Sequence, residues 1–211
     1  MEIVLIIILT LVAYLLGSIP TSVWVGKGYH GVDIRDYGSG NAGATNTFRV
    51  LGTQVGIFVL FLDIVKGITA ASLVHYLPFL HEGTDRFVNI QLLFGLVAVI
   101  GHIFPVFEQF KGGKGIATLF GMLIGIHYAI ALAILGLFIV VLLLTKYVSL
   151  SSILAAVAFP VLTIFVFKRD EPLFIAFGIA AAVLVVLTHK KNITRLLNGE
   201  ESKANLFKSK S

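Results

Sequence analysis

Six long apolar stretches occupy most of this chain and constrain its fold more than any other feature. Each approaches the roughly 20 residues that an α-helix needs to cross a bilayer. They lie at residues 3–25, 54–79, 90–107, 116–145, 148–167 and 173–187. Charged residues make up 13% of the chain, against about 25% in an ordinary soluble domain. A water-soluble globular protein is therefore nearly excluded, and the sequence predicts an all-α integral membrane protein.

The fourth stretch decides how many helices are expected. As one helix, residues 116–145 would be roughly 45 Å long, well beyond the hydrocarbon core of a bilayer. A break near Gly125–His127 divides them into two spans and gives a bundle of seven transmembrane helices, with the N-terminus outside and the C-terminus in the cytoplasm.

The distribution of basic residues favours this break. With it, three basic residues lie outside (Arg86, Lys168 and Arg169) and twelve lie inside, as the positive-inside rule requires. Without it, the best division is eight against seven, which specifies no orientation. The twelve inside residues are Lys27, Arg35, Arg49, Lys111, Lys114, Lys146, Lys190, Lys191, Arg195, Lys203, Lys208 and Lys210.

Composition and the first segment limit the class further. No Lys or Arg precedes the apolar run at residues 3–16 and no small-x-small cleavage site follows it, so it is expected to be a membrane helix and not a signal peptide. The chain has no cysteine, which excludes thiolate chemistry. The net charge of +5 indicates membrane orientation, and no nucleic-acid partner is expected. We expect one membrane-embedded domain, residues 1–211, with a polar tail from about residue 200.

The first polar segment, residues 38–49, contains three glycines in the pattern G-x-G-x-x-G, with Asp63 twenty residues after the last of them. The dinucleotide fingerprint needs a βαβ unit, which a position between membrane helices excludes. Glycines still let backbone N–H groups approach an anion, and Arg49 is suited to grip a phosphate or carboxylate. The alternative is a turn-rich loop whose hydroxyls cap the next helix. The candidate anion-binding residues are Gly38, Ser39, Gly40, Asn41, Gly43, Thr45, Asn46 and Arg49.

The second polar segment, residues 101–115, ends in Lys111, Gly112, Gly113 and Lys114, just before an apolar helix expected from Ile116. Backbone donors, a helix N-terminus and two ammonium groups together indicate an anion site. A Walker A loop is excluded, because it requires glycine where position 108 has glutamate. The alternative is a positive-inside loop in which the glycines merely turn the chain.

Two further groups of polar residues complete the candidate site. In the third segment, residues 189–199, His189 and Asn192 are three residues apart and would share a helical face. A histidine at a helix end is more often a cap than a catalytic group. Within the second apolar stretch, Asp63 and Lys66 are expected to pair, because an unpartnered charge at membrane depth is costly. They would form either a wall of the polar site or a structural ion pair.

The missing motifs narrow the chemistry. The sequence has no H-x₄-D, no G-x-S-x-G elbow and no metal-ligand spacing. We therefore expect no metal, no cofactor and no covalent acyl-enzyme. Catalysis would rest on positioning and electrostatics, which suits a substrate that is already activated.

Three ordered segments together resemble a known family, the integral-membrane bacterial acyl-phosphate:glycerol-3-phosphate acyltransferases. The matching stretches are GSGNAGATNTFRVLG (38–52), GHIFPVFEQFKGGKG (101–115) and HKKNITRLLNG (189–199), supported by FLDIVKG (61–67) and KYVSLSS (146–152). One departure is Thr188, where the resemblance leads us to expect an arginine. Lys190 and Lys191 could substitute for that cation.

The resemblance implies a multi-pass enzyme of the bacterial inner membrane, with its active site facing the cytoplasm. It would transfer a fatty acyl group from acyl phosphate to the 1-hydroxyl of sn-glycerol 3-phosphate, in the first step of phospholipid biosynthesis. The products would be lysophosphatidic acid and inorganic phosphate. The protein would work among membrane lipids, as a monomer. The alternative class is a small transporter or flippase for a phosphorylated metabolite, which would place its binding groups near the midplane.

By the same resemblance, residues important for activity fall on Ser39, Arg49, Lys114, His189 and Asn192, and a phosphate-binding loop falls on Gly112 and Gly113. His102, Asp63 and Lys66 are candidates for a supporting role. The proton of the attacking hydroxyl would pass to His189 or to an oxygen of acyl phosphate, and the sequence leaves both open.

Overall fold

The computed structural model describes residues 1–204, and all regular structure in them is helical. Residues 205–211, which include Lys208, Lys210 and the end of the expected polar tail, lie outside the described residues. Contacts between residues group the chain into two compact units, Met1–Tyr128 and Ala129–Ser211. The expectation of one membrane-embedded domain stays a prediction. The helices are α1 (Glu2–Ser18), α2 (Thr21–His30), η1 (Ile34–Asp36), α3 (Ala44–Val50), α4 (Thr53–Ser72), η2 (Leu73–Tyr76), α5 (Asp85–Ile103), η3 (Val106–Glu108), α6 (Ile116–Thr145), α7 (Val148–Val161), the π-helical turn η4 (Leu162–Val166), α8 (Pro172–Thr188) and α9 (Lys190–Leu197).

The first apolar stretch forms two helices, which corrects the expected single span at residues 3–25. α1 ends at Ser18 and α2 begins at Thr21, with a bend of 44° between them. Ile19 between them has an extended backbone, at φ −60° and ψ 110°. Pro20 explains the break, because its ring has no N–H to continue the helical hydrogen bonds.

The fourth stretch is interrupted where a break is expected. His127 has φ −153° and ψ 84°, which is not helical, inside the otherwise continuous α6. The prediction of a break near Gly125–His127 is thereby confirmed. The boundary between the two compact units follows directly, after Tyr128.

Length and composition mark several helices as candidates to cross a membrane. Within residues 1–204, two bent pairs, α1 with α2 and α8 with α9, raise the number of candidate spans from four to six when each pair is counted as one span. The seven-helix count and the orientation stay predictions. The four unbent candidates are Thr53–Tyr76, Asp85–Glu108, Ile116–Thr145 and Val148–Val166.

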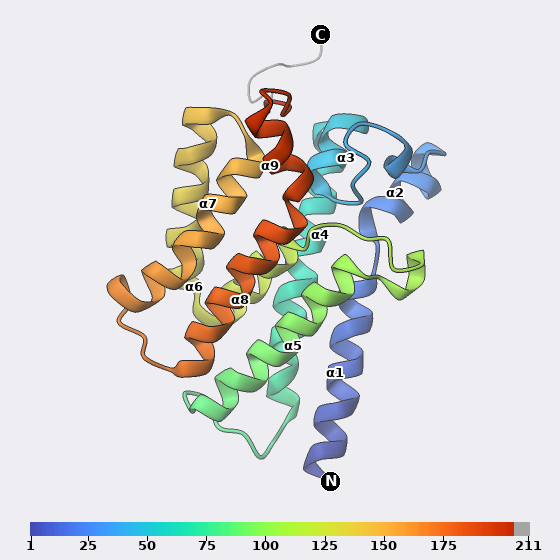
Figure 1. The fold of residues 1–211 in the computed structure, drawn as a ribbon. Coiled ribbons are helices and arrows are strands. Elements are labelled where there is room, and N and C mark those ends of the chain that lie inside the picture. Colours follow the sequence, from blue (N-terminus) through green and yellow to red (C-terminus); the bar gives the residue numbers. More distant parts are fainter. Residues whose placement is uncertain (205–211) are drawn as a thin grey trace. The chain divides into compact units, whose positions relative to one another are not determined.

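In the first unit, α1, α4 and α5 pack side by side (Figure 1). Phe94 and Ala98 of α5 are fully buried in this core with Ala70 and Val74 of the α4–η2 segment. α1 approaches α5 so closely that a Cβ atom on Gly17 would overlap the backbone of Ala98. Small residues at helix contacts are what allow such approach in membrane bundles.

In the second unit, α7 packs against α8 (Figure 1). Phe159 of α7 meets Phe174 and Phe177 of α8 edge to face, with each pair of ring centroids 5.9 Å apart. Pro160 follows inside α7, and the chain then continues as the π-helical turn η4. A proline removes one helical hydrogen bond, which accounts for the change of helix type after it.

Candidate functional site

The first polar segment contains a helix where a loop is expected. Thr45, Asn46 and Arg49 lie on α3, which begins after Gly43. Gly43 and Gly52 flank this short helix, and a glycine at each end was the available sequence signal for it.

Asn46 organises the turn that precedes this helix. It is buried at 1% exposure, and its Oδ1 accepts hydrogen bonds from the backbone N–H of Ser39 (2.8 Å) and from Ser39 Oγ (3.1 Å). Its Nδ2 donates to the carbonyls of Ile34 (2.7 Å) and Tyr37 (3.1 Å). Its polar atoms therefore fix the loop from Ile34 to Ser39, and direct contact with a substrate stays a prediction.

The glycines of the pattern also take part in the turn. The N–H of Gly40 donates to the carbonyl of Tyr37, and the N–H of Gly43 donates to the carbonyl of Asn41, each at 3.1 Å. Arg49 is exposed on α3, and among residues 1–204 it has no hydrogen bond or ion pair. It therefore combines a free guanidinium with a place on the same segment.

Charged side chains tie the first and second polar segments together. Arg35 Nη2 lies 2.6 Å from Asp33 Oδ2 and 2.7 Å from Glu108 Oε2, and Arg35 Nη1 donates to the Lys111 carbonyl at 3.3 Å. Lys27 Nζ lies 3.3 Å from the same two carboxylates. The hydrogen bond from Arg35 lowers the pKa of Asp33 below its usual range, and Asp33 raises the pKa of Arg35.

These charges line a cavity of about 370 Å³. Lys111, one of the predicted phosphate-binding residues, is part of its wall. The lining residues are Lys27, Asp33, Arg35, Asp36, Glu108, Gln109 and Lys111.

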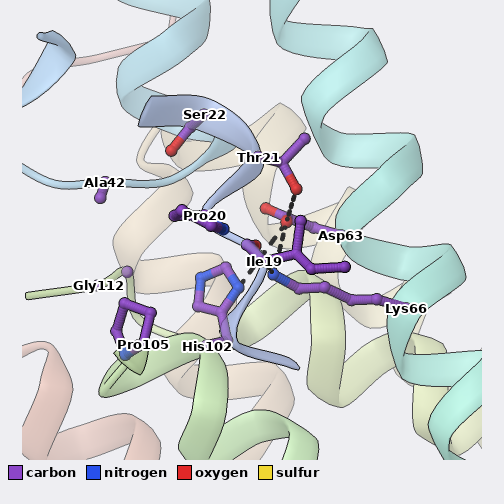
Figure 2. Close-up of a pocket in the computed structure, with 11 residues that line it drawn as sticks. Ile19, Pro20, Thr21, Ser22, Ala42, Asp63, Lys66, His102, Pro105 and Gly112 are labelled. Carbon is purple, nitrogen blue, oxygen red and sulfur yellow. Dashed lines mark hydrogen bonds and ion pairs between the residues drawn. The ribbon is translucent and has the colours of Figure 1, made fainter. Parts of the chain in front are cut away.

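A second, much smaller cavity of about 10 Å³ lies beside a buried polar cluster, with room for about one water molecule. Asp63 and Lys66 form the expected ion pair there, with Lys66 Nζ 3.0 Å from Asp63 Oδ1. Thr21 Oγ1 donates to Asp63 Oδ1 (3.2 Å) and Lys66 Nζ donates to the Ile19 carbonyl (3.1 Å). Figure 2 shows this pair on one side of the His102 ring, with Gly112 and Pro105 on the other.

The two glycines of the second segment complete the wall of this cavity. The N–H of Gly113 donates to the His102 carbonyl and the N–H of Gly112 donates to the Ile103 carbonyl, each at 3.1 Å. A Cβ atom on Gly113 would overlap both His102 Nε2 and the Ala42 carbonyl, so only glycine lets these groups come together. The first and second polar segments therefore meet at Ala42 and Gly113. Lys114 follows, one turn or less from the start of α6.

In the second unit, His189 lies between α8 and α9 and is buried at 3% exposure. Its Nδ1 lies 2.8 Å from the Val185 carbonyl. Because a carbonyl only accepts, this hydrogen bond places a proton on Nδ1 and leaves Nε2 as the basic nitrogen of the neutral ring. Thr188, at the position of the expected arginine, donates from its hydroxyl to the same carbonyl at 3.0 Å.

Glu201 is a buried residue that the sequence did not single out. Its Oε1 accepts hydrogen bonds from Asn192 Nδ2 (2.7 Å) and Ser149 Oγ (2.8 Å), and its Oε2 accepts from Arg195 Nε (2.8 Å). Burial by itself would raise the pKa of Glu201, but these hydrogen bonds outweigh it and hold the pKa below its usual value. The side chain thereby orients Asn192, and a lone glutamate near the end of the chain gave no sequence signal for this.

The fold and the sites define the class of protein: a helical membrane protein with a glycine loop, a helix N-terminus and lysines suited to anions. A family model described as glycerol-3-phosphate acyltransferase matches residues 7–199. A glycerol-3-phosphate acyltransferase of Fusobacterium nucleatum is 45% identical over 90% of this chain and 93% of that protein. The chain therefore belongs to the glycerol-3-phosphate acyltransferase family, and the family resemblance is confirmed.

Solved structures agree with this assignment. The glycerol 3-phosphate form of PlsY, an integral membrane glycerol 3-phosphate acyltransferase, is 35% identical and has a TM-score of 0.83 over 95% of this chain and 96% of that one. Its lysophosphatidic acid form is 37% identical, with a TM-score of 0.79 over 94% of each chain.

Proposed function

We propose that this protein transfers a fatty acyl group from acyl phosphate to the 1-hydroxyl of sn-glycerol 3-phosphate, giving lysophosphatidic acid and inorganic phosphate. The observation that carries the proposal is the family match, because it spans residues 7–199 and so includes all three polar segments. PlsY structures in a glycerol 3-phosphate form and a lysophosphatidic acid form support the acceptor and the product. The acyl phosphate donor is supported by the resemblance of the motifs alone.

The proposed reaction is a direct acyl transfer. The 1-hydroxyl oxygen of glycerol 3-phosphate attacks the acyl carbonyl carbon, the bond from that carbon to the phosphate oxygen breaks, and phosphate leaves. The hydroxyl proton passes to His189 Nε2 or to an oxygen of the acyl phosphate. His189 suits the first route, because the Val185 carbonyl holds the proton of the neutral ring on Nδ1.

Both substrates carry a phosphate, so the site must supply donors and cations. We assign this task to the Gly112–Gly113 loop with Lys111 and Lys114, and to Ser39 and Arg49 of the first segment. Asn192, held by Glu201 at 2.7 Å, is assigned to hold the substrate. The remaining predicted contacts stay with this assignment: Gly38, Gly40, Asn41, Gly43, Thr45 and Asn46.

The proposal includes the setting of the enzyme. It is a monomer in the bacterial inner membrane, with the three polar segments in the cytoplasm, where acceptor and donor are soluble or at the bilayer surface. Counting α6 as two spans on either side of His127, with each bent pair as one span, gives the seven spans of the predicted topology.

The test is release of inorganic phosphate by purified protein. We expect release from acyl phosphate only when glycerol 3-phosphate is present, and we expect acyl-CoA to fail as a donor. Lys114→Ala and Arg49→Ala should each lower kcat/KM by on the order of a hundredfold, because charge-assisted contacts to phosphate are lost. Arg86→Ala, which removes an exposed arginine paired with Glu2, is the matched control and should leave turnover unchanged. Normal turnover in both Lys114→Ala and Arg49→Ala would refute the anion site, and transport of a phosphorylated metabolite without acylation would favour a transporter.

A further inference from the structure

His102 touches the Gly112–Gly113 loop in two ways. Its backbone carbonyl accepts the N–H of Gly113 at 3.1 Å. Its ring abuts the same residue, because a Cβ atom on Gly113 would overlap His102 Nε2. His102 is 8% exposed at the end of α5, and it lines the small cavity together with both glycines. The shape of the loop therefore depends on where this ring lies.

The ring itself is held from behind by polar groups of other elements. Thr118 Oγ1, in the first turn of α6, lies 3.2 Å from His102 Nδ1 and shares a hydrogen bond with it. Asp63 Oδ1 lies 3.8 Å from the same nitrogen. Thr118 is fully buried and Asp63 is 2% exposed, so neither group can exchange its partner for bulk water.

Asp63 is fixed in turn by the chain around the break after α1. It accepts from Thr21 Oγ1 and pairs with Lys66, whose ammonium also donates to the Ile19 carbonyl. A buried ion pair adds little net stability compared with apolar residues of the same size, because both charges lose their hydration. Here the pair joins the α1–α2 break, the end of α5 and the loop (Figure 2).

We infer that His102 is a positioning residue for the phosphate-binding loop, and that the Asp63–Lys66 pair and Thr118 are the groups that hold its ring in place. The inference rests on the proposed function, in which the Gly112–Gly113 loop binds a phosphate. The imidazole touches no reacting atom. It sets the positions of the Gly112 and Gly113 backbones, and so the affinity of the site for phosphate.

The experiment measures phosphate affinity separately from turnover. We compare His102→Phe, which keeps a ring against Gly113 but cannot bond Thr118, with Thr118→Val, which removes the partner and keeps the shape. Each should raise the KM for glycerol 3-phosphate or the inorganic phosphate concentration that halves the rate by on the order of tenfold, because small misplacements of a binding group are costly. kcat should change much less. The double variant should be no worse than either single variant, since both remove one hydrogen bond.

The controls separate this inference from the proposed function and from a folding defect. His75→Phe replaces the exposed histidine of η2 and should change neither constant. If wild-type protein shows no turnover, the proposed function fails. If wild-type protein is active while His102→Phe and Thr118→Val keep the wild-type KM values and phosphate inhibition, the inference is wrong. Should His102→Phe not fold, Thr118→Val with wild-type constants would still overturn it, as would fully additive effects in the double variant.

Discussion

At the scale of single residues, the structure separates polar side chains that shape a loop from those that face open space. Asn46 and Arg49 lie on the same short helix, and both are candidates for anion binding. Asn46 is buried with its hydrogen bonds made inside the protein, whereas Arg49 is exposed. Residue type and spacing are the same kind of evidence for both, so only their surroundings distinguish scaffold from candidate ligand.

Glu201 gives a pH-dependent prediction at this scale. We expect Glu201→Gln to lower the free energy of unfolding by about 2 kcal/mol at pH 7, because three hydrogen bonds to a charged, buried acceptor are weakened. Folding lowers the pKa of this carboxyl from 4.5. Its contribution is therefore fully present above pH 4.5 and is lost as pH falls through the pKa of the folded state.

Thermal unfolding in detergent checks this prediction. The difference in Tm between wild type and Glu201→Gln should be clear at pH 7 and should narrow steadily below pH 4.5. Glu200→Gln changes the exposed neighbour and is the matched control. An equal loss of stability in both variants, or a gap that is constant with pH, would contradict the assignment.

At the scale of elements, helix ends followed local chemistry and helix contacts did not. Pro20 ends the first apolar run, and Pro105 lies just beyond the end of α5 at Ile103. Both breaks follow from the missing N–H of proline. The apolar run at residues 3–25 does not reveal which side of α1 meets α5, because a helix that is apolar all round carries no such signal.

Gly17 gives the prediction for this contact. Gly17→Ala should lower the Tm by several degrees, because the added Cβ would overlap the backbone of Ala98, which cannot move without shifting α5. Gly28→Ala is the matched control, since a Cβ there meets nothing within 4 Å. Equal melting temperatures for Gly17→Ala and wild type would show that α1 and α5 are not in such close contact.

At the scale of the whole molecule, the membrane topology can be tested because the chain has no cysteine of its own. Single cysteines in place of Glu82 and Asp170 should react with an impermeant maleimide in intact spheroplasts. Cysteines in place of His30 and Glu200 should react only after permeabilisation. Asp170 is the decisive position, because it lies outside only if residues 116–145 cross the membrane twice. A protected Asp170→Cys with a reactive Glu82→Cys would refute the seven-helix prediction.

Much of this molecule followed from its sequence. The apolar stretches determined an all-helical membrane protein, the length of residues 116–145 required the break seen at His127, and charges at positions 63 and 66 had to pair. Three ordered polar segments were enough to identify the family. These conclusions depend on the cost of placing polar groups in lipid and on local backbone chemistry, which are properties of neighbouring residues.

Only the tertiary structure decided which polar groups meet. The contact of Ala42 with Gly113, the hydrogen bond of Thr118 to His102 and the hold of Glu201 on Asn192 join residues distant in sequence or without any motif. Such contacts depend on how closely helix backbones approach and on the direction of each side chain, and hydrophobic periodicity specifies neither. The sequence by itself determined where polar chemistry enters an apolar chain, and packing determined which of those groups hold the others in place.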